Sequence, residues 1–121
     1  MPIHKILVVD DSKTELHHLS DILGRRGYSV RTAENGTEAM RRLEEEKPHL
    51  ILMDVVMPGL NGFQLTRAIT RDPRFADVPV IMCTSKSQET DKVWGMRQGA
   101  RDYIVKPVNA DELVTKIKAF D

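Results

Sequence analysis

The feature of this sequence that most constrains its fold is an alternation of short apolar runs with longer amphipathic stretches. The apolar runs are rich in β-branched residues and end at charged or turn-forming residues, which is typical of strands buried on both faces of a sheet. Between these runs, apolar residues recur at helical spacing, as Leu113, Val114 and Ile117 do in the last stretch. The runs that we expect to form strands cover residues 5–9, 28–33, 50–54, 78–84 and 102–105.

Strands that each lead into a helix favour a parallel sheet covered by helices on both faces. We therefore expect an α/β fold, a (βα)5 flavodoxin-like doubly wound parallel sheet with strand order 2-1-3-4-5. A sheet of this kind binds its ligand outside the carboxyl ends of strands 1 and 3. The length of 121 residues predicts a single domain over residues 1–121. We expect no output domain, because the sequence ends soon after the fifth helical stretch.

Several residues predict where the helices begin and end. Ser12 can cap the first helix, because its hydroxyl oxygen can accept from a backbone N–H of the first turn. Gly27 and Gly99 are expected to end the first and fourth helices. The Asn35–Gly36 pair predicts a turn before the second helix.

Composition argues against several classes of protein. Lys and Arg together number 18, as do Asp and Glu, and this zero net charge is unlike the basic excess of nucleic-acid-binding proteins. No apolar stretch approaches the roughly 20 residues of a membrane span, and the amino terminus lacks the pattern of a signal peptide. The single Cys83 excludes an intramolecular disulfide and fits a reducing compartment. We expect a cytoplasmic monomer with neither nucleic acid nor membrane as a partner.

Polar residues stand where four of the predicted strands end. Asp10 and Asp11 follow the first strand, Asp54 ends the third, Thr84 ends the fourth, and Lys106 follows the fifth. The carboxyl ends of parallel strands meet at one edge of a sheet, so we expect these side chains to converge there. Carboxylates that lie so near one another repel. Each pair about 4 Å apart costs on the order of 4 kcal/mol at an effective dielectric constant near 20.

A divalent cation would relieve this repulsion. Mg²⁺ binds oxygen ligands and typically takes one or two carboxylates together with water. Lys106 adds an ammonium and Thr84 adds a hydroxyl, and such groups around a carboxylate can stabilise a transferring phosphoryl group. Asp54 is then the expected nucleophile, because a carboxylate can take a phosphoryl group to form an acyl phosphate.

Four motifs carry a resemblance that covers the whole chain. They are VVDDS at 8–12, LMDVVMPGLNG at 52–62, CTS at 83–85 and GARDYIVKPV at 99–108. In this order and at this spacing, they resemble the receiver domains of two-component response regulators, of the stand-alone CheY-like kind. The stretch QETDKVWGMRQGARDY at 88–103 is similar to the twitching-motility receivers of type IV pilus systems, the PilH-like group.

The resemblance implies a phosphorelay protein and not a conventional enzyme, although such a protein promotes its own phosphorylation and dephosphorylation. The residue matching Asp54 is phosphorylated by a sensor histidine kinase, here of the CheA-like kind. The residues matching Asp10 and Asp11 bind Mg²⁺ together with Asp54, and Mn²⁺ is expected to substitute for it. The backbone carbonyl of Val56 is expected to be a further metal ligand.

The resemblance also assigns roles around the phosphoryl group. Thr84 and Lys106 match positions that contact its oxygens, and Tyr103 matches an aromatic residue whose rotamer follows Thr84. The Lys106–Pro107 peptide bond is expected to be cis, which a proline permits at low cost. The sequence leaves open that Tyr103 is only a core residue.

The output surface is expected on the fourth helix, fifth strand and fifth helix. A downstream motility-machinery or regulatory protein would bind this surface differently before and after phosphorylation. Trp94, Lys92 and Arg97 place an aromatic ring and two cations on the fourth helix, which suits an interface. The sequence alone equally allows Trp94 to pack against its own domain.

Three other functions fit parts of the pattern. A phosphatase with an aspartyl nucleophile usually carries a second Asp two residues later, where this chain has Val56. A flavin-binding flavodoxin-like protein would carry a loop rich in Ser, Thr and Gly after the first strand, whereas DDSKTE at 10–15 is acidic. A degenerate receiver that serves only as a scaffold remains possible, but the polar set is complete: Asp10, Asp11, Asp54, Thr84 and Lys106.

Overall fold

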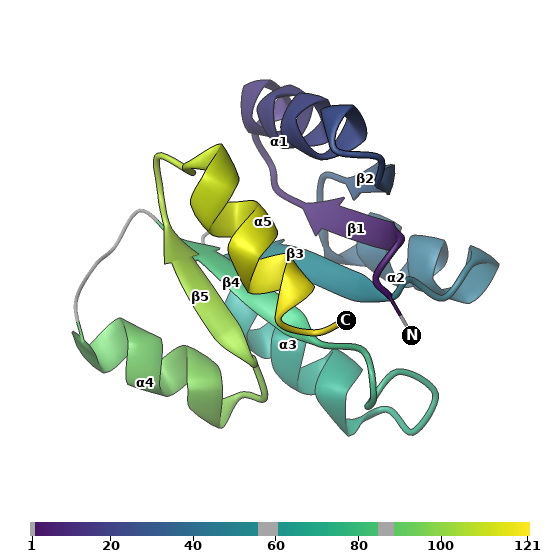
Figure 1. The fold of residues 1–121 in the computed structure, drawn as a ribbon. Coiled ribbons are helices and arrows are strands. Elements are labelled where there is room, and N and C mark those ends of the chain that lie inside the picture. Colours follow the sequence, from purple (N-terminus) through teal and green to yellow (C-terminus); the bar gives the residue numbers. More distant parts are fainter. Residues whose placement is uncertain (1, 56–60, 85–88) are drawn as a thin grey trace.

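The structure is a computed structural model. It describes residues 2–55, 61–84 and 89–121, and for residues 89–92 it describes the backbone but not the side chains. The described strands form one parallel sheet in the order β2-β1-β3-β4-β5, which confirms the predicted topology (Figure 1). The strands are β1 (Lys5–Val9), β2 (Ser29–Ala33), β3 (Leu50–Asp54), β4 (Val80–Thr84) and β5 (Asp102–Val105).

Each strand leads into a helix, and the helices lie on both faces of the sheet (Figure 1). Their buried residues show that α1 and α5 cover one face, while α2 and α3 cover the other. None of the helices in the described part of the chain is both long and apolar enough to cross a membrane. The helices are α1 (Lys13–Arg25), α2 (Gly36–Glu45), α3 (Gly62–Arg71), α4 (Glu89–Arg97) and α5 (Ala110–Lys118).

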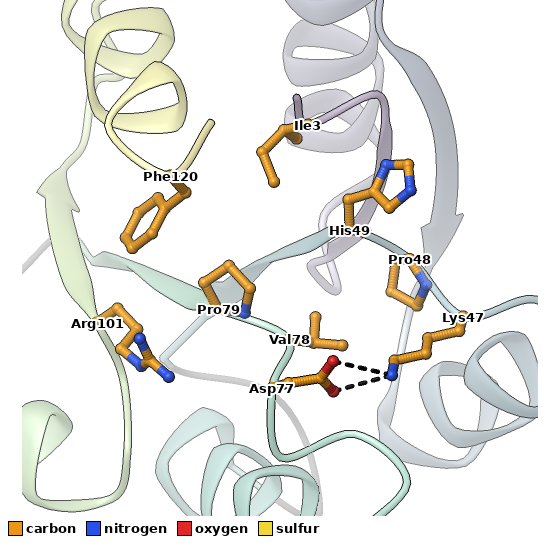
Figure 2. A pocket seen from close by; sticks show the side chains of 9 residues that line it. All are labelled: Ile3, Lys47, Pro48, His49, Asp77, Val78, Pro79, Arg101 and Phe120. Atoms are coloured by element: carbon orange, nitrogen blue, oxygen red, sulfur yellow. Dashed lines mark hydrogen bonds and ion pairs between the residues drawn. The ribbon is translucent and has the colours of Figure 1, made fainter. Parts of the chain in front are cut away.

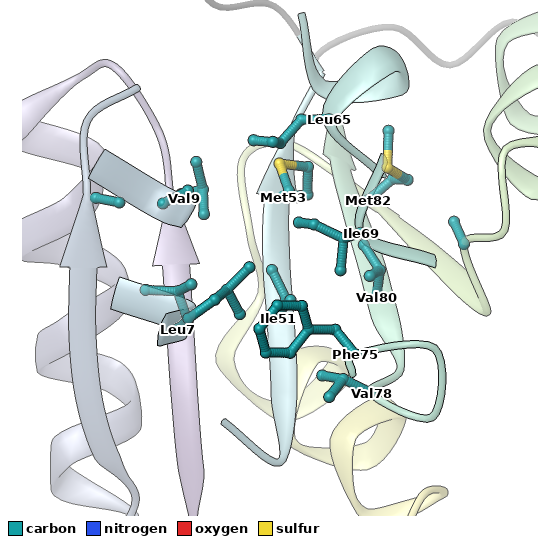
Figure 3. Packing of buried hydrophobic residues seen from close by; sticks show 14 of the residues in the cluster. Leu7, Val9, Ile51, Met53, Leu65, Ile69, Phe75, Val78, Val80 and Met82 are labelled. Carbon is teal, nitrogen blue, oxygen red and sulfur yellow. The ribbon is translucent and has the colours of Figure 1, made fainter. Parts of the chain in front are cut away.

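Two apolar clusters fill the space between the sheet and its helices. Figure 3 shows one of them, in which Ile51 and Met53 of β3 lie close to Leu65 and Ile69 of α3. The second cluster joins β1 and β3 to α1 and α5. Each fully buried side chain of this size contributes roughly 1.5–3 kcal/mol. These buried side chains therefore supply much of the stability of the fold.

Side chains cap α1 and α2 where the chain turns away from β1 and β2. Ser12 Oγ accepts from the backbone N–H of Glu15 (3.2 Å), as predicted. The chain bends at Glu34 and Asn35, so the predicted turn at Asn35–Gly36 lies one residue earlier. Asn35 also caps α2, because its Oδ1 accepts from the backbone N–H of Glu38 (2.8 Å) and Gly36 is already the first helical residue. Asn and Asp favour turns and helix caps by the same local hydrogen bond.

Two strands begin later than the sequence predicted from their apolar residues. The backbone N–H of Tyr28 donates to the carbonyl of Leu23 and so closes the end of α1. Val78 likewise donates its backbone N–H to Phe75, and Pro79 has no N–H to donate. Because these backbone groups belong to turns, β2 starts at residue 29 and β4 at residue 80.

Gly27 and Gly99 follow α1 and α4 with φ angles of 90° and 108°. These angles lie in the left-handed region, where glycine has no Cβ penalty. The predicted helix-ending role of both residues is therefore confirmed.

Candidate functional site

Three carboxylates meet at the carboxyl edge of the sheet. Asp10 follows β1 and is 1% exposed, Asp54 ends β3 and is 7% exposed, and Asp11 is on the surface. One carboxylate oxygen from each lies within 4.8 Å of the others. The strand register explains why Asp10 and Asp54 lie close together. Val9 of β1 pairs with Met53 of β3, so the residues that follow them lie side by side.

The ammonium of Lys106 lies between two of these carboxylates. Its Nζ is 2.8 Å from Oδ2 of Asp10 and 3.0 Å from Oδ1 of Asp54. The backbone N–H of Lys106 donates to the carbonyl of Thr84 (2.7 Å), which ties the segment after β5 to the end of β4. The Lys106–Pro107 peptide bond is cis in the structure. The Lys106 side chain thus reaches the ends of β1 and β3 from the edge of the sheet.

Burial dominates the electrostatics of Asp54. Loss of solvation raises its pKa from 3.8 to about 6, although bonding to Lys106 acts in the opposite direction and the charges of Asp10 and Asp11 add to the rise. Burial lowers the pKa of Lys106, but its hydrogen bonds to Asp10 and Asp54 outweigh that effect and raise this pKa above its ordinary value. Lys106 therefore remains an ammonium, and it is the Asp54 carboxyl that titrates between acidic and neutral pH.

The start of α3 packs directly against the backbone of Asp54. The N–H of Gly62 donates to the carbonyl of Val55 (2.8 Å), and the N–H of Val55 donates to the carbonyl of Cys83 (3.2 Å). A Cβ atom at position 62 would overlap the carbonyl oxygen of Asp54. Glycine at this position therefore allows α3 to begin against the end of β3 and to fix the backbone that carries the Asp54 side chain.

Asp10 and the start of α1 share a hydrogen-bond network that leaves one carboxylate oxygen of Glu15 without a partner among the described residues. The backbone N–H of Ser12 donates to Oδ1 of Asp10 (3.0 Å). In a capping box, this N–H would instead bind the Glu side chain three residues after the cap. Oε1 of Glu15 is accordingly buried with no hydrogen-bond partner in the described part of the chain. Glu15 was not among the residues predicted to form the site, although the spacing of Ser12 and Glu15 is a capping-box signal.

Thr84 and Tyr103 line one small cavity beside the carboxylates. Thr84 is 5% exposed at the end of β4, and Tyr103 is half-buried on β5. The cavity has a volume of about 10 Å³, which suffices for about one water molecule. A tyrosine ring could enter only if Met82 or Met96, which also line it, moved aside. Methionine side chains adapt readily, so such a movement is feasible.

The donor set fits a hard divalent cation. Asp10, Asp11 and Asp54 offer only carboxylate oxygens, which are the ligands that Mg²⁺ and Mn²⁺ prefer. Asp11 makes no ion pair with a described residue and is free to turn toward a metal ion. The backbone carbonyl of Val56, the fourth predicted ligand, lies outside the described residues.

The outer face of α4 carries apolar side chains. Val93, Trp94 and Met96 are 44%, 51% and 45% exposed. Trp94 is therefore only half covered by its own domain, and the rest of its surface faces solvent. Arg97 is exposed on the same helix, whereas the side chain of Lys92 lies outside the described residues.

A larger hollow lies at the amino ends of the strands, away from the carboxylates (Figure 2). Its volume is about 580 Å³, and its walls include Ile3, Val78 and Phe120. An ion pair between Lys47 Nζ and Asp77 Oδ1 (2.9 Å) joins two of its loops. None of the predicted site residues lines this hollow, so the converging polar groups and this hollow are separate features.

Comparisons with known proteins agree with this geometry. Residues 6–118 match the response regulator receiver domain. The chain is 53% identical over 115 residues to Protein PilH of Pseudomonas aeruginosa, and the match covers 95% of each chain. The structure is similar to that of the chemotaxis protein CheY4 of Vibrio cholerae, with a TM-score of 0.92, 30% identity and coverage of 98% of this chain and 99% of that one. It is also similar to a BeF3-activated DrrB receiver domain, with a TM-score of 0.86, 32% identity and coverage of 99% and 97%. With its parallel sheet and its carboxylates at the strand ends, this chain belongs to the response regulator receiver domain family of two-component signalling.

Proposed function

We propose that this protein is a phospho-acceptor of a two-component phosphorelay, in which Asp54 takes a phosphoryl group from a phosphohistidine of a CheA-like sensor histidine kinase. A carboxylate oxygen of Asp54 would attack the phosphorus, the P–N bond would break, and the histidine nitrogen would leave and take up a proton. Water can later hydrolyse the resulting acyl phosphate. The observation that carries the proposal is the contact of Asp54 with Lys106 inside a cluster of carboxylates.

Lys106 and Thr84 have complementary roles in this proposal. The Lys106 ammonium already lies 3.0 Å from Oδ1 of Asp54, where it can stabilise negative charge on the entering group. The hydroxyl of Thr84 stands at the end of the neighbouring strand and would donate to a phosphoryl oxygen. Both groups are held by strand ends, so little reorganisation is needed when the phosphoryl group arrives.

Asp10, Asp11 and Asp54 would hold Mg²⁺, with Mn²⁺ as a substitute and the carbonyl of Val56 as a further ligand. The cation would neutralise charge on the phosphoryl oxygens. The all-oxygen donor set supports this assignment. Because Asp11 is exposed and has no ion-pair partner among the described residues, its carboxylate costs little to recruit.

The test of the proposal uses a small acyl phosphate donor with Mg²⁺ and intact-mass spectrometry. The parent protein should gain one phosphoryl group, and Asp54→Asn should gain none. Asp77→Asn is the matched control, because Asp77 is an exposed Asp in the loop before β4, at the other end of the strands. An Asp54→Asn variant that is modified as well as the parent would refute the proposal.

The output surface in this proposal is made by α4, β5 and α5. When Thr84 binds the phosphoryl group it vacates space beside Tyr103, and the ring turns inward past Met96 of α4. The exposed apolar residues Val93, Trp94 and Met96 support α4 as the docking element. A coupling of about 1–3 kcal/mol between site and surface is typical and changes partner affinity several-fold.

The downstream partner is proposed to belong to the motility machinery of type IV pili or to its regulation, in the cytoplasm. The support is the 53% identity to PilH. Capture of partners from the protein's own cytoplasm should differ with and without beryllofluoride, a mimic of the phosphoryl group. Trp94→Ala should weaken the phosphorylation-dependent capture, while Asp77→Asn should leave it unchanged. Equal capture in both states would refute this part of the proposal.

A further inference from the structure

Three groups at the open edge of the sheet form a contact that the phosphoryl chemistry does not require. Lys116 Nζ of α5 lies 3.1 Å from Oδ1 of Asp102 and 5.5 Å from the ring centre of Tyr103. Asp102 and Tyr103 are consecutive residues of β5, the last strand in the sheet, and so their side chains point to opposite faces. Lys116 therefore reaches across the edge strand from α5 to the ring.

Asp102 fixes the position of this ammonium. Its Oδ1 also accepts from the backbone N–H of Tyr103 (2.8 Å), so the carboxylate is held by the strand itself. The Lys116 and Asp102 side chains are only 26% and 30% exposed, which limits screening of their ion pair by water. An ammonium anchored in this way cannot follow the Tyr103 ring when the ring moves.

We propose that Lys116 is a positioning residue that favours the unphosphorylated position of Tyr103 through the contact between its Asp102-anchored ammonium and the ring. The inference rests on the proposed function, because it concerns the residue that would carry the signal. A cation–π contact extends to about 6 Å. The observed separation of 5.5 Å is near that limit, so an inward turn of the ring ends the contact. Lys116 thus opposes switching until Asp54 is phosphorylated.

The expected size of the effect follows from the exposure of the pair. A cation–π contact at a partly exposed site favours one state over the other by roughly 2- to 5-fold. Removal of the ammonium should raise the switched fraction of the unphosphorylated protein by that factor. It should leave the ability of Asp54 to accept a phosphoryl group intact, because Lys116 does not contact the carboxylate cluster.

Fluorine NMR of 3-fluorotyrosine-labelled protein tests the inference. The chain has two tyrosines, and Tyr28→Phe assigns the resonance of Tyr103. In the parent, beryllofluoride with Mg²⁺ should move the Tyr103 resonance. Without beryllofluoride, Lys116→Met should already shift this resonance part of the way in the same direction, and Lys118→Met, on the exposed side of α5, should not.

Two further variants separate positioning from a general loss of stability. Lys116→Arg should keep the parent resonance, because a guanidinium can pair with a carboxylate and lie over an aromatic ring. In an Asp102→Asn background, Lys116→Met should shift the resonance less than it does in the parent, because the ammonium has already lost its anchor.

The possible failures are distinguishable. A parent whose resonance moves with beryllofluoride, together with a Lys116→Met spectrum that coincides with the parent's, would overturn the role of Lys116 alone. A Lys116→Arg variant that behaves like Lys116→Met would also overturn it. A parent that shows no movement with beryllofluoride and gains no mass with the phosphoryl donor would overturn the proposed function, and this inference with it.

Discussion

The ammonium nitrogen of Lys106 lies 3.0 Å from Oδ1 of Asp54, and the buried Asp54 carboxylate forms no other ion pair within the described part of the chain. Lys106→Met should therefore leave buried charge uncompensated. Removal of one partner of a buried pair typically costs about 3–5 kcal/mol. We expect a loss near the lower end of that range in urea unfolding at pH 8 without metal, because the Lys106 side chain is 20% exposed. The loss should shrink at pH 5, where Asp54 is largely protonated. An equal loss at both pH values would contradict the pairing.

The raised pKa of Asp54 predicts the pH dependence of stability in the metal-free protein. The folded-state pKa of about 6 exceeds the ordinary value of 3.8, so the folded protein binds more protons than the unfolded chain between these values. Stability from this group is present below pH 4 and is lost as the pH rises through about 6. The difference corresponds to about 3 kcal/mol. The free energy of unfolding of Asp54→Asn relative to the parent should therefore rise by up to that amount from pH 4 to pH 7. An unchanged difference would refute the raised pKa.

Removal of Asp11 should separate metal binding from folding. Asp11→Ala should weaken Mg²⁺ binding and slow phosphorylation of Asp54 together, because one oxygen ligand is lost. The metal-free variant should unfold at the same or a slightly higher temperature than the parent, since Asp11 only adds repulsion to Asp54. Intrinsic tryptophan fluorescence during a Mg²⁺ titration and thermal unfolding would measure the two effects. An unaltered Mg²⁺ affinity would remove Asp11 from the site.

Much of the fold was predictable from the sequence because the buried strands β1, β3 and β4 are short apolar runs that end at or just before a polar residue. The convergence of Asp10, Asp54 and Lys106 then followed from topology, since parallel strands present their carboxyl ends at one edge. The starts of β2 and β4 were less predictable. They depend on whether a backbone N–H binds to a turn or to a neighbouring strand, and the apolar character of a residue does not determine that.

The contacts that the sequence left unpredicted depend on side-chain reach. Oε1 of Glu15 lacks a hydrogen-bond partner among the described residues, because Asp10 takes the donor that a capping box would supply. Lys116 reaches Tyr103 only because β5 is an edge strand and α5 packs beside it. Such relationships depend on contacts between side chains in the folded protein, and the periodicity of the sequence contains no information about them.

Gly62 should be intolerant of even a methyl group. Its Cα faces the carbonyl of Asp54 so closely that a Cβ atom would overlap it, so Gly62→Ala must displace either α3 or the end of β3. We expect a loss of about 1–3 kcal/mol in the free energy of unfolding, as for other overpacked sites, and slower phosphorylation of Asp54. Gly24→Ala is the control, because nothing lies within 4 Å of a Cβ atom there, and it should stabilise α1 by up to about 1 kcal/mol. Gly62→Ala with the stability and phosphorylation rate of the parent would contradict this account.

Thr84 should couple the phosphoryl group to Tyr103 without being needed for phosphorylation. Thr84→Ala removes the hydroxyl beside the small cavity and also leaves room that the Tyr103 ring can enter in either state. Asp54 should still gain a phosphoryl group, but the several-fold difference in partner affinity between the two states should fall toward unity. Thr84→Ser keeps the hydroxyl and should retain most of that difference.

Binding of the partner to each variant, with and without beryllofluoride, measures the coupling, and hydrogen exchange locates the binding surface. An unchanged difference in Thr84→Ala, or protection on α2 and α3 instead of α4, β5 and α5, would show that the signal leaves the site by another route.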